Sequence, residues 1–157
     1  MKVFIKNTDG ALVLAPHPES HLTALIALDQ SIMHYPWPEK TWRSELGNAH
    51  TYAALYPQIG FILFDNNPLE NTLHLLKIAL LENQRGQGRA QLIFQEFLEL
   101  ISQERGSVPA VFLEVESKNS RAIAFYHKLG FKNLHLKKKF YSDGLDALSM
   151  IYESESS

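Results

Sequence analysis

The segment from Leu75 to Ala90 constrains the fold of this chain most. An apolar run, Leu75–Leu81, leads into the turn Arg85-Gly86-Gln87-Gly88, and apolar side chains then recur at helical spacing from Ala90 onward. Glycine allows positive φ and lets a ligand approach the backbone closely. Because the start of a helix presents unpaired N–H groups and the positive end of the helix dipole, this order favours a bound phosphate or pyrophosphate.

A glycine turn that binds no ligand is equally compatible with these residues. A Walker-type phosphate loop is excluded, because no Gly-Lys-Ser/Thr sequence follows the turn. A dinucleotide-binding fold fits poorly, since its glycine fingerprint follows the first strand and this turn lies in the middle of the chain. The turn alone therefore leaves phosphate binding open.

Length and composition exclude several classes of protein. A chain of 157 residues predicts one domain, over residues 1–157, that buries about two thirds of its unfolded surface. The absence of cysteine excludes disulfides, thiolate metal ligands and cysteine nucleophiles. The seven histidines show no paired ligand spacing, so we expect no metal. The net charge of -2 argues against nucleic-acid binding, and no apolar run suits a membrane span or a secretory signal, so we expect a cytoplasmic protein.

The periodicity predicts a mixed α/β domain. Strands are expected over residues 2–5, 11–15, 50–56, 59–64, 71–81, 111–116, 131–139 and 146–152, with a turn at residues 65–68. Helices are expected after Pro18, over Glu39–Leu46, after the glycine turn, and from a cap at Asn119 or Ser120 to an end at Gly130. The helix after the glycine turn is the clearest, because six apolar residues form one stripe: Ala90, Ile93, Phe94, Phe97, Leu98 and Ile101.

Two residues in the second half of the chain are candidates for proton transfer. Glu114 lies in a strand whose other face is apolar, and a buried carboxyl group tends to have a raised pKa, which suits a general base. Tyr126 lies on the apolar side of the last helix, and its phenol keeps a proton that it can donate to a departing thiolate. The alternatives are an exposed strand carboxylate and a core aromatic. Asn119 can bond a ligand or cap the helix.

The residues around these candidates resemble a known family. The matching motifs are Tyr35-Pro36-Trp37-Pro38-Glu39-Lys40-Thr41-Trp42, Leu113-Glu114-Val115, Ala122-Ile123-Ala124-Phe125-Tyr126, Leu129-Gly130-Phe131 and Tyr141–Met150. Together with the strand and the glycine turn, they resemble the GCN5-related N-acetyltransferase (GNAT) superfamily, and within it the ribosomal-protein alanine N-acetyltransferases. The resemblance covers nearly the whole chain, from the first helix to the last strand.

The resemblance implies a fold, a co-substrate and a set of site residues. The fold is a mixed central β-sheet of six to seven strands flanked by about four helices. The co-substrate is acetyl-CoA, with the pantetheine arm along the strand and the phosphates at the turn. The residues implied to bind it are Ile78, Ala79, Leu80, Gln84, Arg85, Gly86, Gln87, Gly88, Arg89 and Asn119. Glu114 is implied as the base and Tyr126 as the acid of a direct transfer to an amine.

The implied acceptor is the N-terminal α-amine of a protein, which in the family is a ribosomal protein. Tyr35, Trp37 and Tyr141 are expected to wall the peptide groove. Three residues depart from the family's pattern: Asn83 at the start of the phosphate motif, and Glu116 and Leu145, which bear on the choice of acceptor. Two alternatives stay open, namely a family member that acetylates a small amine or antibiotic and a non-catalytic acyl-CoA-binding module.

Overall fold

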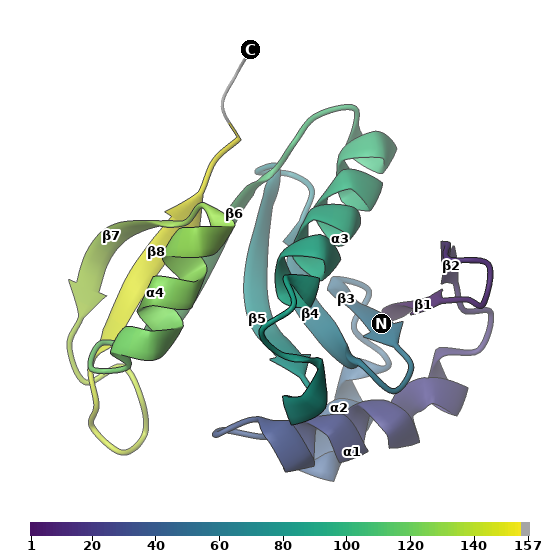
Figure 1. Ribbon diagram of the computed structural model, residues 1–157, viewed down its shortest axis with the longest axis horizontal. Coiled ribbons are helices and arrows are strands. Elements are labelled where there is room, and N and C mark those ends of the chain that lie inside the picture. The colour runs from purple at the N-terminus through teal and green to yellow at the C-terminus, as the bar shows by residue number, and fades with distance from the viewer. Residues whose placement is uncertain (155–157) are drawn as a thin grey trace. The chain divides into compact units, whose positions relative to one another are not determined.

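The chain forms two compact units. The computed structural model describes residues 1–154, and the first unit comprises residues 1–66 and 75–97. Among the described residues, the second unit comprises residues 67–74 and 98–154. Strand β5 (Thr72–Leu80) and helix α3 (Arg89–Arg105) contribute to both units (Figure 1). A single domain over the whole chain stays a prediction.

The first unit holds the elements of the N-terminal half. They are β1 (Lys2–Lys6), β2 (Leu12–Leu14), the 3-10 helix η1 (Pro18–His21), α1 (Leu22–Ile32), α2 (Glu39–Glu45), β3 (Thr51–Tyr56), β4 (Gly60–Asn67) and a second 3-10 helix, η2 (Glu82–Gln84), which precedes α3. Strand β1 pairs with β2 antiparallel and with β3 in parallel, and β3 pairs with β4 antiparallel.

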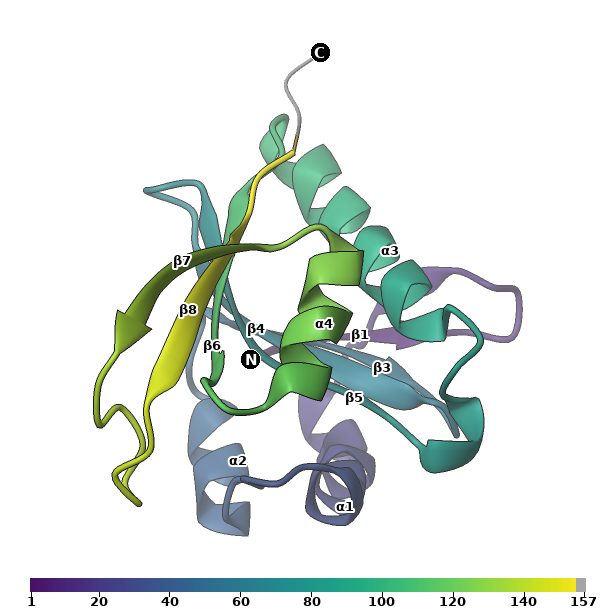
Figure 2. The same cartoon turned by 60° about the vertical axis from the view of Figure 1, so that its left-hand side comes forward.

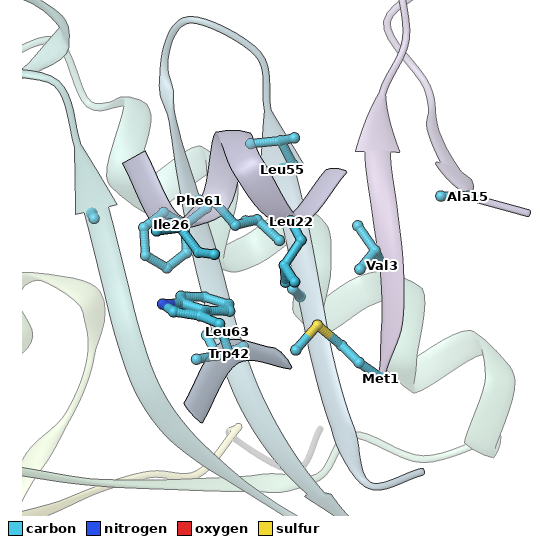
Figure 3. Close-up of a cluster of buried hydrophobic side chains, with 12 residues drawn as sticks. Met1, Val3, Ala15, Leu22, Ile26, Trp42, Leu55, Phe61 and Leu63 are labelled. Atoms are coloured by element: carbon cyan, nitrogen blue, oxygen red, sulfur yellow. The ribbon is translucent and has the colours of Figure 1, made fainter. Parts of the chain in front are cut away.

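Helices α1 and α2 pack on the strands of this unit through one apolar cluster. Leu22 and Ile26 of α1 and Trp42 of α2 are at most 9% exposed, and they lie beside Phe61 and Leu63 of β4 (Figure 3). The rings of Trp42 and Phe61 meet edge to face, with centroids 5.9 Å apart. Burial of this apolar surface is the main contribution that holds α1 and α2 on the strands.

Helix α3 buries the stripe that its sequence predicts. All six residues of the stripe are at most 9% exposed, whereas Leu92, which lies off the stripe, is 68% exposed. The ring of Phe97 meets Phe4 edge to face at 5.9 Å and stacks on Phe64 at 4.9 Å between centroids. The helix ends before Gly106, whose φ of 75° no continuing helix allows.

The second unit places one helix beside three paired strands. It contains β6 (Ala110–Glu116), α4 (Ser120–Leu129), β7 (Lys132–Lys137) and β8 (Ala147–Tyr152). Strand β8 lies between β6 and β7 and is antiparallel to both, as Figure 2 shows. Asn119 caps α4 through its Oδ1, which accepts the Ala122 N–H at 3.1 Å, and Gly130 ends the helix at a φ of 108°.

The strands are hydrogen-bonded in the order β2-β1-β3-β4-β5-β6-β8-β7, which makes a mixed sheet. The predicted α/β fold is confirmed. Residues 1–154 contain eight strands, slightly more than the six to seven expected, and four α-helices.

One predicted turn is wrong. Asp65 pairs with Thr51, and the Asn66 N–H donates to the His50 carbonyl at 2.7 Å, so β4 continues to Asn67. The chain turns instead at residues 68–71, where Asn71 has a φ of 54°. The pairing with β3 outweighs the local turn preference of aspartate and asparagine.

Candidate active site

The glycine turn has the backbone that its sequence predicts. Gly86 and Gly88 adopt φ angles of 76° and 73°, and α3 begins at Arg89. A Cβ added at either glycine would meet nothing within 4 Å, so the left-handed backbone, and not crowding, requires glycine here. The first N–H groups of a helix have no partner within it. The turn can therefore present several N–H groups to an anion.

Two arginines add positive charge to this turn. The Arg85 Nε donates to the Leu80 carbonyl at 3.0 Å, and the Arg89 Nε donates to the Gln87 Oε1 at 3.2 Å. Gln87 in turn donates through Nε2 to the Asn83 carbonyl at 3.4 Å. The bond from Arg85 ties the turn to the end of β5. A guanidinium is well suited to phosphate, because its N–H groups match the spacing of two phosphate oxygens.

Strand β4 approaches β5 closely beside the residues predicted to bind pantetheine. A Cβ on Gly60 would lie 2.0 Å from the Ala79 carbonyl oxygen, a separation that no side chain allows. Ala79 and Leu80 are buried, and Ile78 is partly exposed. The end of β5 is thus held against β4, and Ile78 is the most accessible of the three residues.

Glu114 lies in the second unit with two polar partners. Its side chain is 14% exposed, and its neighbours Leu113 and Val115 are buried, as the strand alternation predicts. The Glu114 Oε2 lies 2.5 Å from His74 Nε2, and its Oε1 lies 2.9 Å from Lys137 Nζ. The hydrogen bond to His74, assisted by that from Lys137, outweighs burial and lowers the pKa of the Glu114 carboxyl to about 2. The predicted raised pKa is therefore wrong.

His74 and Lys137 reach Glu114 from other strands. His74 pairs with Phe112, two residues before Glu114, in the parallel register of β5 and β6. Lys137 lies on β7, beyond β8. Sequence reasoning missed both residues, because His74 and Glu114 are 40 positions apart and a lone histidine in a strand carries no motif. No local pattern in the sequence signalled either contact.

Tyr126 lies in an aromatic group of the second unit. Its ring meets Phe125 at 5.2 Å and Phe131 at 5.8 Å between centroids. Burial raises the pKa of Tyr126 to about 12. The phenol therefore keeps its proton at neutral pH, as a proton donor must. Asn119 uses its Oδ1 to cap the same helix, so its amide nitrogen is the part that a ligand would meet.

A buried ion pair holds the aromatic loop between α1 and α2. Asp29 is fully buried, and its Oδ1 lies 2.9 Å from Lys77 Nζ. Its Oδ2 accepts the backbone N–H of Trp37 and the indole N–H of Trp42, each at 2.9 Å. Lys77 also donates to the Tyr35 carbonyl at 2.8 Å, and its Nζ lies 5.4 Å from the centroid of the Trp37 ring. One buried ion pair thus anchors Tyr35 and Trp37, two of the residues predicted to wall the peptide groove.

Sequence reasoning missed this pair as well. Lys77 is 5% exposed, and burial lowers its pKa although Asp29 opposes that shift. A lysine inside the apolar run Leu75–Leu81 was the available signal, because a charged side chain in a buried strand requires a partner. Tyr35 is 40% exposed, while Trp37 packs partly against the core.

Tyr141 lies in the loop between β7 and β8. Its N–H donates to the Leu145 carbonyl at 3.1 Å, and its own carbonyl accepts the Gly144 N–H at 2.9 Å. A pocket of about 140 Å³ adjoins this turn, lined by Glu116, Ser117, Lys118, Gly144, Leu145 and Asp146. Glu116 and Leu145, which both depart from the family's pattern, therefore line the same pocket.

The predicted site residues are divided between the two units. The first unit holds Tyr35, Trp37, residues 78–80 and residues 84–89, and the second holds Glu114, Asn119, Tyr126 and Tyr141. In residues 1–154, no three His, Asp or Glu side chains gather as a metal site would require, and the absence of a metal stays a prediction. No helix in that part of the chain combines the length and the apolar character needed to cross a membrane.

Residues 21–131 match the model of the acetyltransferase (GNAT) family. The chain is 30% identical over 128 residues to the N-alpha-acetyltransferase RimI of Mycobacterium tuberculosis, a match that covers 76% of this chain and 77% of that protein. It is 27% identical over 133 residues to the ribosomal protein bS18-alanine N-acetyltransferase of Escherichia coli, covering 82% of this chain and 88% of the relative.

The identity to a third relative is higher but extends over a shorter part of the chain. An N-alpha-acetyltransferase of Sulfurisphaera tokodaii is 38% identical over 77 residues, which is 49% of this chain and 46% of that relative, so the match spans about half of its length. The crystal structure of the ribosomal-protein-S18-alanine N-acetyltransferase of Escherichia coli has the same fold. It superposes with a TM-score of 0.71 at 23% identity, over 91% of this chain and 96% of that one.

Proposed function

Because the chain belongs to the acetyltransferase (GNAT) family, whose members are acetyl-CoA-dependent acetyltransferases, we propose that it acetylates the N-terminal α-amine of a protein. The observation that carries this acceptor is the similarity, over more than three quarters of the chain, to enzymes named for acetylation of α-amines. The name of the Escherichia coli relative favours a ribosomal protein as the acceptor. An enzyme with that acceptor would act in the cytoplasm.

The chemistry of the amine supports the same choice. An α-amine has a pKa near 8, whereas the lysine side chain has a pKa near 10.4. Only the neutral amine is a nucleophile, so deprotonation of an α-amine at neutral pH costs less. Tyr35, Trp37 and Tyr141 are the proposed walls of the peptide groove.

We assign acetyl-CoA to the segment that runs from β5 into α3. The N–H groups of residues 84–89 and the guanidinium groups of Arg85 and Arg89 would hold the pyrophosphate. Ile78, Ala79 and Leu80 would bond the pantetheine arm through their backbone, and Asn119 would add one bond. A strand N–H near Leu80 is the proposed donor to the oxyanion that forms when the amine attacks the thioester.

Tyr126 is the proposed acid that protonates the departing CoA thiolate. Glu114 stays in the proposed catalytic site as an ionised carboxylate. Its pKa of about 2 makes it a weak acceptor for a proton from an ammonium group of pKa near 8. We therefore propose that a second group takes that proton.

One experiment separates the α-amine acceptor from the alternatives. The full chain is incubated with acetyl-CoA and a set of peptides with free N-termini, the same peptides with blocked N-termini and one lysine, and polyamines. We expect mass spectrometry to find the acetyl group on the free N-termini. Acetylation of polyamines alone would favour a small-amine enzyme, and acetyl-CoA binding without acetylation of any amine would favour a binding module.

The Gly88→Val variant tests the phosphate site. A branched side chain strains a residue at a φ of 73°, so the turn should lose the backbone path that exposes its N–H groups. We expect acetyl-CoA to bind about tenfold or more weakly, which corresponds to about 1.4 kcal/mol, in calorimetry. Gly10→Val is the matched control, because Gly10 has a φ of 83° and equally open surroundings, but lies in a distant turn of the chain. Equal affinities of the two folded variants would contradict the assignment.

A further inference from the structure

We propose that His74 takes the proton from the acceptor ammonium and that Glu114 is the positioning residue that orients the imidazole and stabilises its charge. This inference rests on the proposed acetylation of an amine. It assigns the proton transfer to a histidine of β5 in place of the carboxylate of β6.

The geometry of the pair fixes the role of each ring nitrogen. An ionised carboxylate can only accept hydrogen bonds, so the His74 Nε2 that lies 2.5 Å from Glu114 Oε2 must carry a hydrogen. A neutral imidazole carries one hydrogen, and Nδ1 therefore holds the lone pair that accepts a proton. A carboxylate on one ring nitrogen is the arrangement that holds an imidazole in a single tautomer for use as a base.

Glu114 itself is poorly placed to act as the base. Both of its oxygens are already engaged, Oε2 with His74 and Oε1 with Lys137 Nζ at 2.9 Å. Its side chain is 14% exposed, against 40% for His74, so the imidazole is the more accessible group. Transfer of a proton from an α-ammonium to a carboxyl whose pKa is lowered to about 2 is also unfavourable. The His74 imidazole instead offers Nδ1, whose lone pair is not engaged by Glu114 and can accept that proton.

Two charged side chains of this unit lie around His74. Glu114 of β6 contributes a negative charge in direct contact with Nε2. Lys137 of β7 contributes a positive charge, but it lies on the far oxygen of the same carboxylate. The imidazolium that forms after proton transfer would therefore lie closer to the negative charge of Glu114 than to the positive charge of Lys137, which stabilises it.

The proton balance of the reaction is complete with these groups. The Nδ1 lone pair of His74 bonds one proton of the acceptor ammonium, the N–H bond breaks, and its electrons stay on the amine. The amine nitrogen then bonds the thioester carbon, the C–S bond breaks, and Tyr126 protonates the thiolate. The new amide nitrogen loses its extra proton, which restores the phenol, and His74 releases its proton to water. The products are the acetylated amine, CoA thiol and one proton.

The test compares three variants at pH 7 with saturating acetyl-CoA and an N-terminal peptide. We expect His74→Gln to lower kcat by about 10²-fold without changing the affinity for acetyl-CoA. Glu114→Gln should lower kcat by less, about tenfold, because the amide oxygen still orients the ring but no longer stabilises its charge. His135→Gln, which removes another exposed strand histidine of the same unit, is the matched control and should retain the wild-type kcat.

Two further measurements exclude a merely structural role for His74. Imidazole added to the folded His74→Ala variant should restore part of the lost kcat, because it supplies the missing base. The deficit of His74→Gln should also shrink as pH rises above about 8, where the free amine no longer needs a base. Glu114 cannot cause this dependence, because a carboxyl of pKa about 2 stays ionised throughout.

The outcomes distinguish this inference from the proposed function. Wild-type kcat in His74→Gln, or a larger loss in Glu114→Gln than in His74→Gln, would overturn the role of His74. If the wild type acetylates only lysine or polyamines, the α-amine proposal fails, and the same variants are compared with that amine, whose ammonium must also lose a proton. A wild type that acetylates no amine would overturn both.

Discussion

The Asp29→Asn variant is expected to lose about 3–5 kcal/mol of its free energy of unfolding. Asparagine keeps the size of the side chain but removes the charge that pairs with Lys77, which is 5% exposed. The buried ammonium is then left without a counter-ion. In the wild type, three donors bond the two carboxylate oxygens of Asp29, namely the Trp37 N–H, the Trp42 indole N–H and Lys77 Nζ. Asparagine offers one oxygen and one NH₂ group in their place, so at least one of the three donors loses its acceptor.

Urea denaturation of the wild type and the variants measures this loss. Arg43→Met is the control, because the Arg43–Glu39 pair is exposed at the surface of α2 and should contribute little. The double variant Asp29→Asn with Lys77→Met should recover part of the stability, since methionine removes the unpaired buried charge. A loss below about 1 kcal/mol in Asp29→Asn would contradict the account of a buried, fully bonded pair.

The same substitution should affect the acceptor more than the co-substrate. Asp29 holds the backbone of Trp37, and Lys77 holds the carbonyl of Tyr35, so the loop loses both anchors together. If this loop walls the peptide groove, the KM for the peptide rises in the folded variant while acetyl-CoA affinity changes little.

The Tyr126→Phe variant is expected to lower kcat by about 10²-fold. The substitution removes only the hydroxyl group, so the CoA thiolate must leave without a proton donor. The aromatic contacts with Phe125 and Phe131 need no hydroxyl, and the affinity for acetyl-CoA should therefore stay within about twofold of the wild type. Steady-state kinetics and calorimetry on the same preparations measure the two quantities.

The pKa of Tyr126 also predicts how the effect of Tyr126→Phe on kcat depends on pH. Burial raises that pKa to about 12, so the phenol carries its proton throughout an assay between about pH 6 and 10. The ratio of wild-type kcat to variant kcat should therefore not fall over this pH range through deprotonation of the phenol. Tyr52→Phe, which removes the hydroxyl of a buried tyrosine in the first unit, serves as the control. Unchanged kcat in Tyr126→Phe would remove it from the mechanism.

The local features of this protein were readable in the sequence because they depend on residues close together in the chain. Gly86 and Gly88 take positive φ as predicted, the stripe of α3 is buried, and Asn119 and Gly130 bound α4. Each of these depends on backbone geometry or on side-chain spacing within a few residues. The exception was the end of β4, where a paired strand overrode the turn preference of three polar residues.

The electrostatics of the site was decided by the tertiary structure alone. Glu114 lies in a strand whose other face is apolar. That pattern predicts burial of the strand, and burial alone would raise the pKa of the Glu114 carboxyl. The folded chain instead brings His74 from 40 residues upstream and Lys137 from 23 residues downstream, and their hydrogen bonds reverse the sign of the shift. Asp29 meets Lys77 across 48 residues in the same way. The sequence by itself determined where the helices, the strands and the glycine turn lie, apart from the end of β4. The pairing of distant polar groups, which sets their pKa values, depends on the register of the strands and on the packing of α1 upon them.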